Sequence, residues 1–275
     1  NMGDIDRQTI TGATQTGTHG TGSRLGGLST SIVGATFVSG TGELVTVNAE
    51  EHPELLPAIA LGLGALGVIV TVTVQCVPRY LLRAEEGTDQ LSAVLDSFVD
   101  RSRAADHFEF FWFPHAQTVH TNSHTRLPLN AGSEPLTRVS RFLDEEVANN
   151  VAFGACAALG SLMPAFTPSI NRVIESVSSS RSYSDESHRV YVTHRRVRFR
   201  EMEYGVPLEA VPEVMRELGR LIQRGKYRVS FPIEVRSAAA DSLLLSTAHG
   251  RETGYVAVHR YARDRDTHYF REAEA

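Results

Sequence analysis

Helical and strand-like patterns of hydrophobic residues follow one another along this chain of 275 residues. Apolar residues at helical spacing predict amphipathic helices over residues 88–103 and 209–224, and a short helix over 54–63. Runs of β-branched and aromatic residues predict strands over 28–38, 44–47, 68–74, 107–114, 118–126, 190–198, 201–206, 227–236, 243–248 and 254–261. Residues 134–140 are expected to form a loop. Because several strands follow one another directly, the pattern favours an α+β fold over strict βαβ alternation.

The segment with the most unusual composition is residues 11–22, Thr-Gly-Ala-Thr-Gln-Thr-Gly-Thr-His-Gly-Thr-Gly. Glycine lets the backbone approach a ligand closely, while threonine hydroxyls and free N–H groups supply hydrogen-bond donors at short range. This combination suits a diphosphate or another polyoxygenated ligand. A Gly/Thr-rich turn without a ligand has the same composition, so these residues alone leave both interpretations open.

A second glycine motif, at residues 62–67 (Gly-Leu-Gly-Ala-Leu-Gly), has the GxGxxG form of a dinucleotide-binding fingerprint. That fingerprint requires a strand before it and a helix after it. Here a predicted helix precedes the glycines and a predicted strand follows them. We therefore reject a Rossmann NAD site and expect the glycines to turn a helix tightly into a buried strand.

Charge and cysteine usage narrow the function classes. The formal net charge of −5 gives no basic surface that would favour nucleic acid. Lys226 is the only lysine, so chemistry that requires a lysine has one candidate in this chain. Cys76 and Cys156 form no disulfide framework, and Cys76, which lies in an apolar run, is expected to be a buried thiol. A reducing, cytoplasmic compartment follows, with a peripheral position at a membrane left open.

The longest uncharged stretch, residues 147–171, contains asparagines and prolines. It predicts a buried or surface-lying helix near residues 151–163 rather than a membrane span. No signal-peptide pattern opens the chain. The first residues read as the middle of a domain and the last as the first turn of a helix, so we expect a fragment of a longer protein.

Residues 231–236, Phe-Pro-Ile-Glu-Val-Arg, place a carboxylate and a guanidinium two positions apart. On a strand, Glu234 and Arg236 would point to the same side, where the pair could bind a polyol. An isolated Glu-x-Arg is more often a surface salt bridge.

Three other sets of polar residues carry weaker signals. His120 and His124 lie four positions apart, but in a predicted strand and loop, so we expect no metal site. Ser184, Asp185 and His188 crowd into one segment, whereas a hydrolase triad joins separate elements. His19, inside the Gly/Thr segment, is a better functional candidate.

Several segments in this order resemble the aldonolactone oxidases, a family of flavoproteins of the vanillyl-alcohol-oxidase (VAO/PCMH) type. The family includes L-gulono-1,4-lactone and D-arabinono-1,4-lactone oxidases, with bacterial alditol oxidases as relatives. The resemblance covers essentially the whole chain and rests on residues 3–6, 8–13, 16–22, 62–69, 107–114, 201–204 and 231–236.

The resemblance implies that FAD lies between two domains. Residues 1–82 would form the second half of the FAD-binding domain, and residues 83–275 a cap domain with a large antiparallel sheet flanked by helices. Glu234 and Arg236 match the family's catalytic and substrate-binding pair, and Thr18 would lie beside the substrate. The cofactor-binding residues implied are Thr16, Gly17, Thr18, His19, Gly20, Thr21, Gly22 and, through its backbone near the adenine, Ile69.

The reaction that the resemblance implies is oxidation of a CH–OH group of a sugar lactone, with hydride transfer to flavin N5. Arg236 would stabilise the developing oxyanion, and Glu234 would hold sugar hydroxyls. The electron acceptor stays open among oxygen, a quinone and a cytochrome. The alternatives are an alditol oxidase and a non-catalytic carbohydrate-binding or structural fragment.

Two family motifs have no counterpart in this sequence: the upstream loop in which some members attach FAD to a histidine, and a C-terminal His-Trp-Gly-Lys. Lys226 precedes the Glu-Val-Arg strand and cannot be the motif's lysine. We therefore expect the chain alone to bind FAD weakly or not at all, and to show no turnover.

Overall fold

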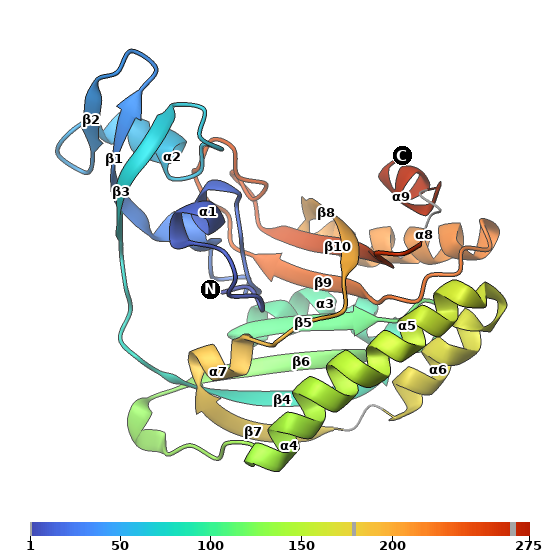
Figure 1. The fold of residues 1–275 in the computed structure, drawn as a ribbon. Coiled ribbons are helices and arrows are strands. Elements are labelled where there is room, and N and C mark those ends of the chain that lie inside the picture. Colours follow the sequence, from blue (N-terminus) through green and yellow to red (C-terminus); the bar gives the residue numbers. More distant parts are fainter. Residues whose placement is uncertain (1, 178–179, 265–267) are drawn as a thin grey trace.

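Two antiparallel sheets make up much of the computed structural model, which describes residues 2–177, 180–264 and 268–275 (Figure 1). The smaller sheet has the strand order β2-β1-β3, with strands Leu44–Val47, Ile32–Ser39 and Gly67–Val74. The larger sheet has the order β7-β4-β6-β5-β9-β10-β8. Its strands are Arg181–Glu186, Leu81–Gln90, Thr118–Leu127, His107–Trp112, Ile233–Ala238, Thr253–Tyr261 and Phe199–Pro207.

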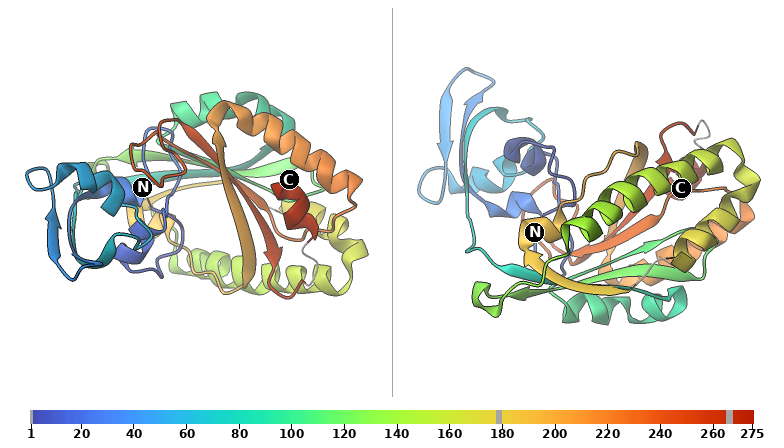
Figure 2. Two further views of the ribbon diagram at one scale, coloured as in Figure 1. Left: turned by 90° about the horizontal axis from the view of Figure 1, so that it is seen from above. Right: turned by 60° about the horizontal axis from the view of Figure 1, so that its bottom comes forward.

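Helices cover the two faces of the larger sheet differently. On one face lie α3 (Leu91–Ala104) and α8 (Val211–Arg224). Over the other face runs a helical hairpin (Figure 2), built from α4 (Arg138–Phe142), a π-helical segment (Leu143–Ala152), α5 (Phe153–Leu162) and α6 (Thr167–Val177). The other α-helices of the described residues are α1 (Ile10–Gln15), α2 (Leu56–Ile59), α7 (Ser187–Tyr191) and α9 (His268–Glu274). The predicted α+β fold class is confirmed.

The larger sheet has one apolar and one polar face, because side chains alternate along each strand. In β5, Phe108, Phe110 and Trp112 join the buried core formed with α3 and α8. His107 and Glu109 point to the opposite face. This second face carries the charged residues described below.

Local hydrogen bonding overrides three predictions of secondary structure. Residues 190–198 form no strand: α7 ends at Tyr191, and the backbone N–H of Thr193 donates to the carbonyl of Asp4. Residues 243–248 form a turn, because the carboxylate of Asp241 accepts from the N–H of Leu243 and from a serine hydroxyl. Within the expected loop 134–140, Thr137 caps the start of α4.

The segment that follows the GxGxxG motif is only half buried. α2 precedes the glycines and β3 follows them, as expected, and a Cβ atom at Gly67 would lie 2.0 Å from the carbonyl oxygen of Val38. However, Val68 in β3 is 72% exposed, and Cys76 is exposed as well. The expectation of a buried strand and a buried thiol is wrong, because β3 packs on the described chain with one side only.

In the part of the chain that the structure describes, no single helix is long and apolar enough to cross a membrane. Residues 138–162 and 164–176 meet that test only as a pair, and the two helices are bent by 120° at their junction.

Candidate functional site

Arg236 lies among three carboxylates on the polar face of the larger sheet. Its Nε donates to Oε2 of Glu109 at 3.0 Å, its NH2 group lies 3.6 Å from Oδ1 of Asp4, and it forms an ion pair with Glu234. The side chains of Arg236 and Glu234 are each only 11% exposed. The pair is therefore not a surface salt bridge, which was the commoner explanation for the motif in isolation.

Neighbouring side chains fix this cluster in place. Asn122 on β6 donates to the second carboxylate oxygen of Glu109 at 3.0 Å. Arg195, in the segment after α7, lies 2.5 Å from Oδ2 of Asp4. The first residues of the chain are thus tied to the sheet.

Burial and the charges in this cluster shift the pKa values of Glu234 and Arg236. Burial raises the pKa of Glu234 to about 7; Arg236 opposes the shift, while Asp4 and Glu109 add to it. The pKa of Arg236 lies well above its usual value: burial opposes this, but the three carboxylates outweigh it. A carboxyl group that titrates near neutrality beside a permanent cation can take up or release a proton at working pH.

The Gly/Thr segment divides into a helix and a loop. Its first part belongs to α1, where the hydroxyl of Thr9 caps the helix by accepting from the N–H of Gly12. The loop starts at Thr16, and Gly17 adopts a φ of +73°, which favours glycine. Thr18 donates its hydroxyl hydrogen to the side chain of Gln8 at 2.9 Å.

The second half of the loop is bound to the larger sheet. Thr21 is buried; its hydroxyl donates to the carbonyl of Phe108 and accepts from the N–H of Ser237. The N–H of Gly22 donates to the carbonyl of Ser237 at 2.8 Å. These bonds tie the loop to β5 and β9, the strands that carry Glu109, Glu234 and Arg236.

His107 adds a further clamp behind the loop. Its Nδ1–H donates to the carbonyl of Thr21 at 2.7 Å, and its Nε2 accepts from the hydroxyl of Tyr191 at 2.6 Å and from Nε of Arg126 at 3.2 Å. Burial lowers the pKa of His107 to about 3, so the ring is neutral and can accept these bonds.

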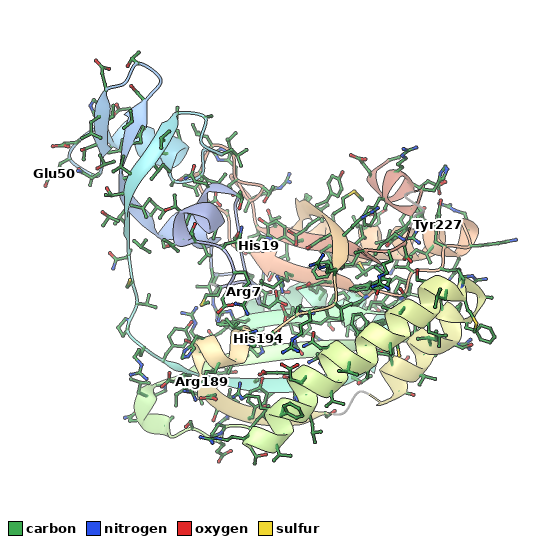
Figure 3. The ribbon with its side chains drawn as sticks, in the orientation of Figure 1. Arg7, His19, Glu50, Arg189, His194 and Tyr227 are labelled. Atoms are coloured by element: carbon green, nitrogen blue, oxygen red, sulfur yellow. The ribbon has the colours of Figure 1, made fainter. Side chains whose placement is uncertain are left out.

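His19 joins the loop to the polar face of the sheet (Figure 3). Its ring stacks on Tyr255 of β10 at a centroid distance of 3.7 Å, and its Nε2 lies 3.0 Å from Oε2 of Glu203 on β8. A cavity of about 250 Å³ opens beside this stack. Its lining includes Thr16, Gly17, His19, Glu203 and Tyr255.

The other sequence candidates lie apart from this cavity. Ile69 is half-buried in β3 and pairs with β1. His120 and His124 both point from β6 to the polar face, where His124 packs beside His107. Asp185 is paired with Arg141, and His188 contacts Glu186.

The comparison with known proteins settles the family. Residues 72–275 match the family model described as D-arabinono-1,4-lactone oxidase. The chain belongs to this family. It is 40% identical to L-gulono-1,4-lactone dehydrogenase of Mycobacterium tuberculosis over the whole chain and 63% of that protein. It is 27% identical to L-gulonolactone oxidase of Bos taurus, over 95% of the chain and 59% of the relative. It thus spans somewhat less than two thirds of these relatives' length.

The fold of this family member is shared with more distant proteins. Cholesterol oxidase from B. sterolicum superposes with a TM-score of 0.76 at 17% identity, over 100% of this chain and 62% of the other. The VAO/PCMH-type fold predicted from the resemblance is confirmed.

Sequence reasoning missed the supporting residues of the site. Asp4 and Arg195 lie far apart along the chain, and the predicted strand over 190–198 gave no sign that it would approach Asp4, so no pattern joined them to Arg236. The alternation of residues 107–112, with His107 and Glu109 between aromatic residues, did carry a signal for a polar face. The prediction of a strand over residues 107–114 did not single out Glu109 as a site residue.

Proposed function

We propose that this chain forms part of an FAD-dependent oxidoreductase that oxidises a CH–OH group of a sugar lactone. The observation that carries the proposal is the buried Glu234–Arg236 pair on β9, one of the two strands to which the Gly/Thr loop is bound. Membership in the D-arabinono-1,4-lactone oxidase family supports the substrate class. The division into a cofactor domain up to residue 82 and a cap domain from residue 83 is part of this proposal.

The residues present fit a phosphate-bearing cofactor at the loop. Among the described residues, the backbone N–H groups of His19 and Gly20 have no hydrogen-bond partner, and Gly17 leaves the backbone open beside the cavity. Such neighbouring N–H groups bind anions. We assign contact with the cofactor to residues 16–20, and anchoring of the loop to Thr21 and Gly22. Ile69 would contribute its backbone from the smaller sheet.

The chain's own groups would then act on the substrate. Bound FAD would supply the two-electron acceptor for the hydride of the CH–OH group. Glu234 would accept the hydroxyl proton, since its pKa of about 7 suits a general base near neutrality. Arg236, held at Nε by Glu109, would stabilise negative charge on the substrate oxygen. Thr18 would position the substrate from the loop side.

The proposal is tested by lactone oxidation with an artificial acceptor, in the protein encoded by the complete gene. Glu234→Gln and Arg236→Lys should each lower kcat/KM by at least about 100-fold, because each removes a group that acts on the reacting oxygen. Glu213→Gln, an exposed change on α8, is the matched control. Unchanged kcat/KM in both site variants would refute the assignment. Alditols tested in parallel separate the alternative substrate class.

A further inference from the structure

His259 of β10 lies between a buried and an exposed carboxyl group. β10 is the strand between β9 and β8 in the larger sheet (Figure 1). Ala257 of β10 pairs with Glu234 of β9. His259, two residues further along β10, pairs with Glu201 of β8, so all these side chains lie on the polar face of the sheet. The side chains of His259 and Glu234 are 7% and 11% exposed, whereas that of Glu201 is 42% exposed.

The ring of His259 is held so that one nitrogen faces Glu201. Its Nδ1–H donates to the backbone carbonyl of Pro232 at 2.9 Å, and its Nε2 lies 3.5 Å from Oε1 of Glu201. The ring of Phe199 packs edge-on against the imidazole at a centroid distance of 5.2 Å. Nε2 is therefore the nitrogen that can take up and release a proton while the bond to Pro232 stays intact.

The other charged groups that act on Glu234 are engaged elsewhere. Arg236 is a permanent cation, and the carboxylates of Asp4 and Glu109 each lie against an arginine. His259 is the remaining charged group that acts on this carboxyl among the described residues. Imidazole is the side chain that ordinarily titrates near neutrality, so it is the group here that is suited to pass a proton on.

We propose that His259 and Glu201 carry to solvent the proton that Glu234 takes from the substrate hydroxyl. The inference rests on the proposed function, in which Glu234 is the base. The O–H bond of the substrate breaks, its proton bonds to a carboxylate oxygen of Glu234, and its electron pair forms the C=O bond as the hydride leaves. The proton then passes by way of Nε2 of His259 to the carboxylate of Glu201, which releases it to water.

The spacing of these groups permits the transfer. Glu234 and His259 are diagonal neighbours on adjacent strands, a position in which Cβ atoms lie about 7–8 Å apart and long side chains reach one another. One water molecule bridges any remaining gap between a proton donor and its acceptor. Glu201 is the directly opposed neighbour on the other side of β10.

The charges around His259 favour this order of events. Burial disfavours the charged ring, but Glu201 and Glu234 outweigh burial and raise the pKa of His259. Interaction with His259 in turn lowers the pKa of Glu201. When Glu234 takes up the substrate proton, one of the two carboxylates that stabilise the imidazolium becomes neutral. The ring then releases its proton toward Glu201 and can accept the next one from Glu234.

Turnover in dilute and concentrated buffer tests the proposal, in the FAD-loaded protein encoded by the complete gene. Near neutral pH, His259→Gln and Glu201→Gln should each lower kcat for lactone oxidation by about tenfold or more in dilute buffer, because the proton leaves Glu234 slowly. Added imidazole at constant ionic strength should restore most of the rate, and KM should stay unchanged. The matched control is His188→Gln, which changes a histidine 3.6 Å from Glu186 and should behave like wild type at every imidazole concentration.

The possible failures are distinguishable. A loss of kcat that imidazole restores in neither variant would overturn the proposal, because a purely structural role predicts that result. Wild-type kcat in both variants, with Glu234→Gln inactive, would also overturn it and leave the base assignment standing. Full activity of Glu234→Gln would refute the base assignment, and the relay with it.

Histidine NMR titration of the same protein gives a readout without turnover. The His259 imidazole, assigned by its absence in His259→Gln, should titrate at lower pH in Glu234→Gln and in Glu201→Gln than in wild type. Each change removes a carboxylate that stabilises the imidazolium. An unchanged His259 titration in both variants would overturn the proposal. Glu201 is exposed, so its variant should fold like wild type, which circular dichroism verifies.

Discussion

Two buried carboxyl groups, Glu175 and Glu234, keep their protons up to near-neutral pH for different reasons. Glu175 on α6 is 3% exposed, neither carboxylate oxygen has a hydrogen-bond partner among the described residues, and burial alone raises its pKa to about 7. Glu234 combines burial with the charges of a cluster that includes Arg236. The first carboxyl is a cost to the fold, whereas the second belongs to the proposed chemistry.

Glu175→Gln should stabilise the protein above neutral pH. In the folded protein the pKa of Glu175 is raised from the ordinary value of 4.5 to about 7. The protonated carboxyl is therefore favoured by folding: its contribution to the free energy of unfolding is complete below about pH 4.5 and is lost as pH rises to about 7. The loss is on the order of 3 kcal/mol, and the variant should not show it. Urea unfolding between about pH 4 and pH 8 measures this. Glu213→Gln, at an exposed position on α8, should keep the wild-type pH dependence, and an equal dependence in Glu175→Gln would contradict the account.

At the scale of elements, the larger sheet depends on close contact between β10 and α8. The buried face of α8 carries Val211, Met215, Leu218 and Ile222, as its periodicity predicts. Gly254 lies directly beneath Val211, where a Cβ atom would come within 2.1 Å of the valine Cγ2. The strand and the helix were both predictable; the need for glycine where they meet was not, since it depends on their packing distance.

Gly254→Ala should therefore destabilise the protein by about 2 kcal/mol, because the added methyl group must displace a fully buried valine. Gly40→Ala is the matched control: it lies between β1 and β2, and nothing occupies the space within 4 Å of its Cβ position. Guanidinium unfolding of both variants measures the difference. A Gly254→Ala protein as stable as Gly40→Ala would show that α8 can shift without cost.

At the scale of the whole molecule, the site brings together distant parts of the chain. Asp4, Glu109, Arg195 and the Glu234–Arg236 pair come from the first segment, from β5, from the irregular segment after α7 and from β9. Of these, the sequence predicted only the last pair. The segment 192–198 resembled a strand, but its groups bond to Asp4 and to Asn150 instead of to a neighbouring strand.

Asp4→Asn should lower the pKa of Glu234, because it removes a negative charge that disfavours ionisation of that carboxyl. Carboxyl NMR titration, with the Glu234 resonance assigned from Glu234→Gln, measures the shift independently of activity. Asp6→Asn, an exposed neighbour in the same segment, serves as the control and should leave the Glu234 titration unchanged. A Glu234 pKa that stays at the wild-type value in Asp4→Asn would show that Asp4 does not act on it.

The sequence by itself determined the elements with strong periodicity, the Gly/Thr loop, the Glu234–Arg236 pair and the family resemblance, because these depend on spacing within short segments. Tertiary structure alone decided that the pair is buried, that Glu109 and Asp4 flank it, and that half of the loop is bound to the sheet. Burial and charge pairing depend on segments far apart in the chain, so a local sequence pattern cannot predict them.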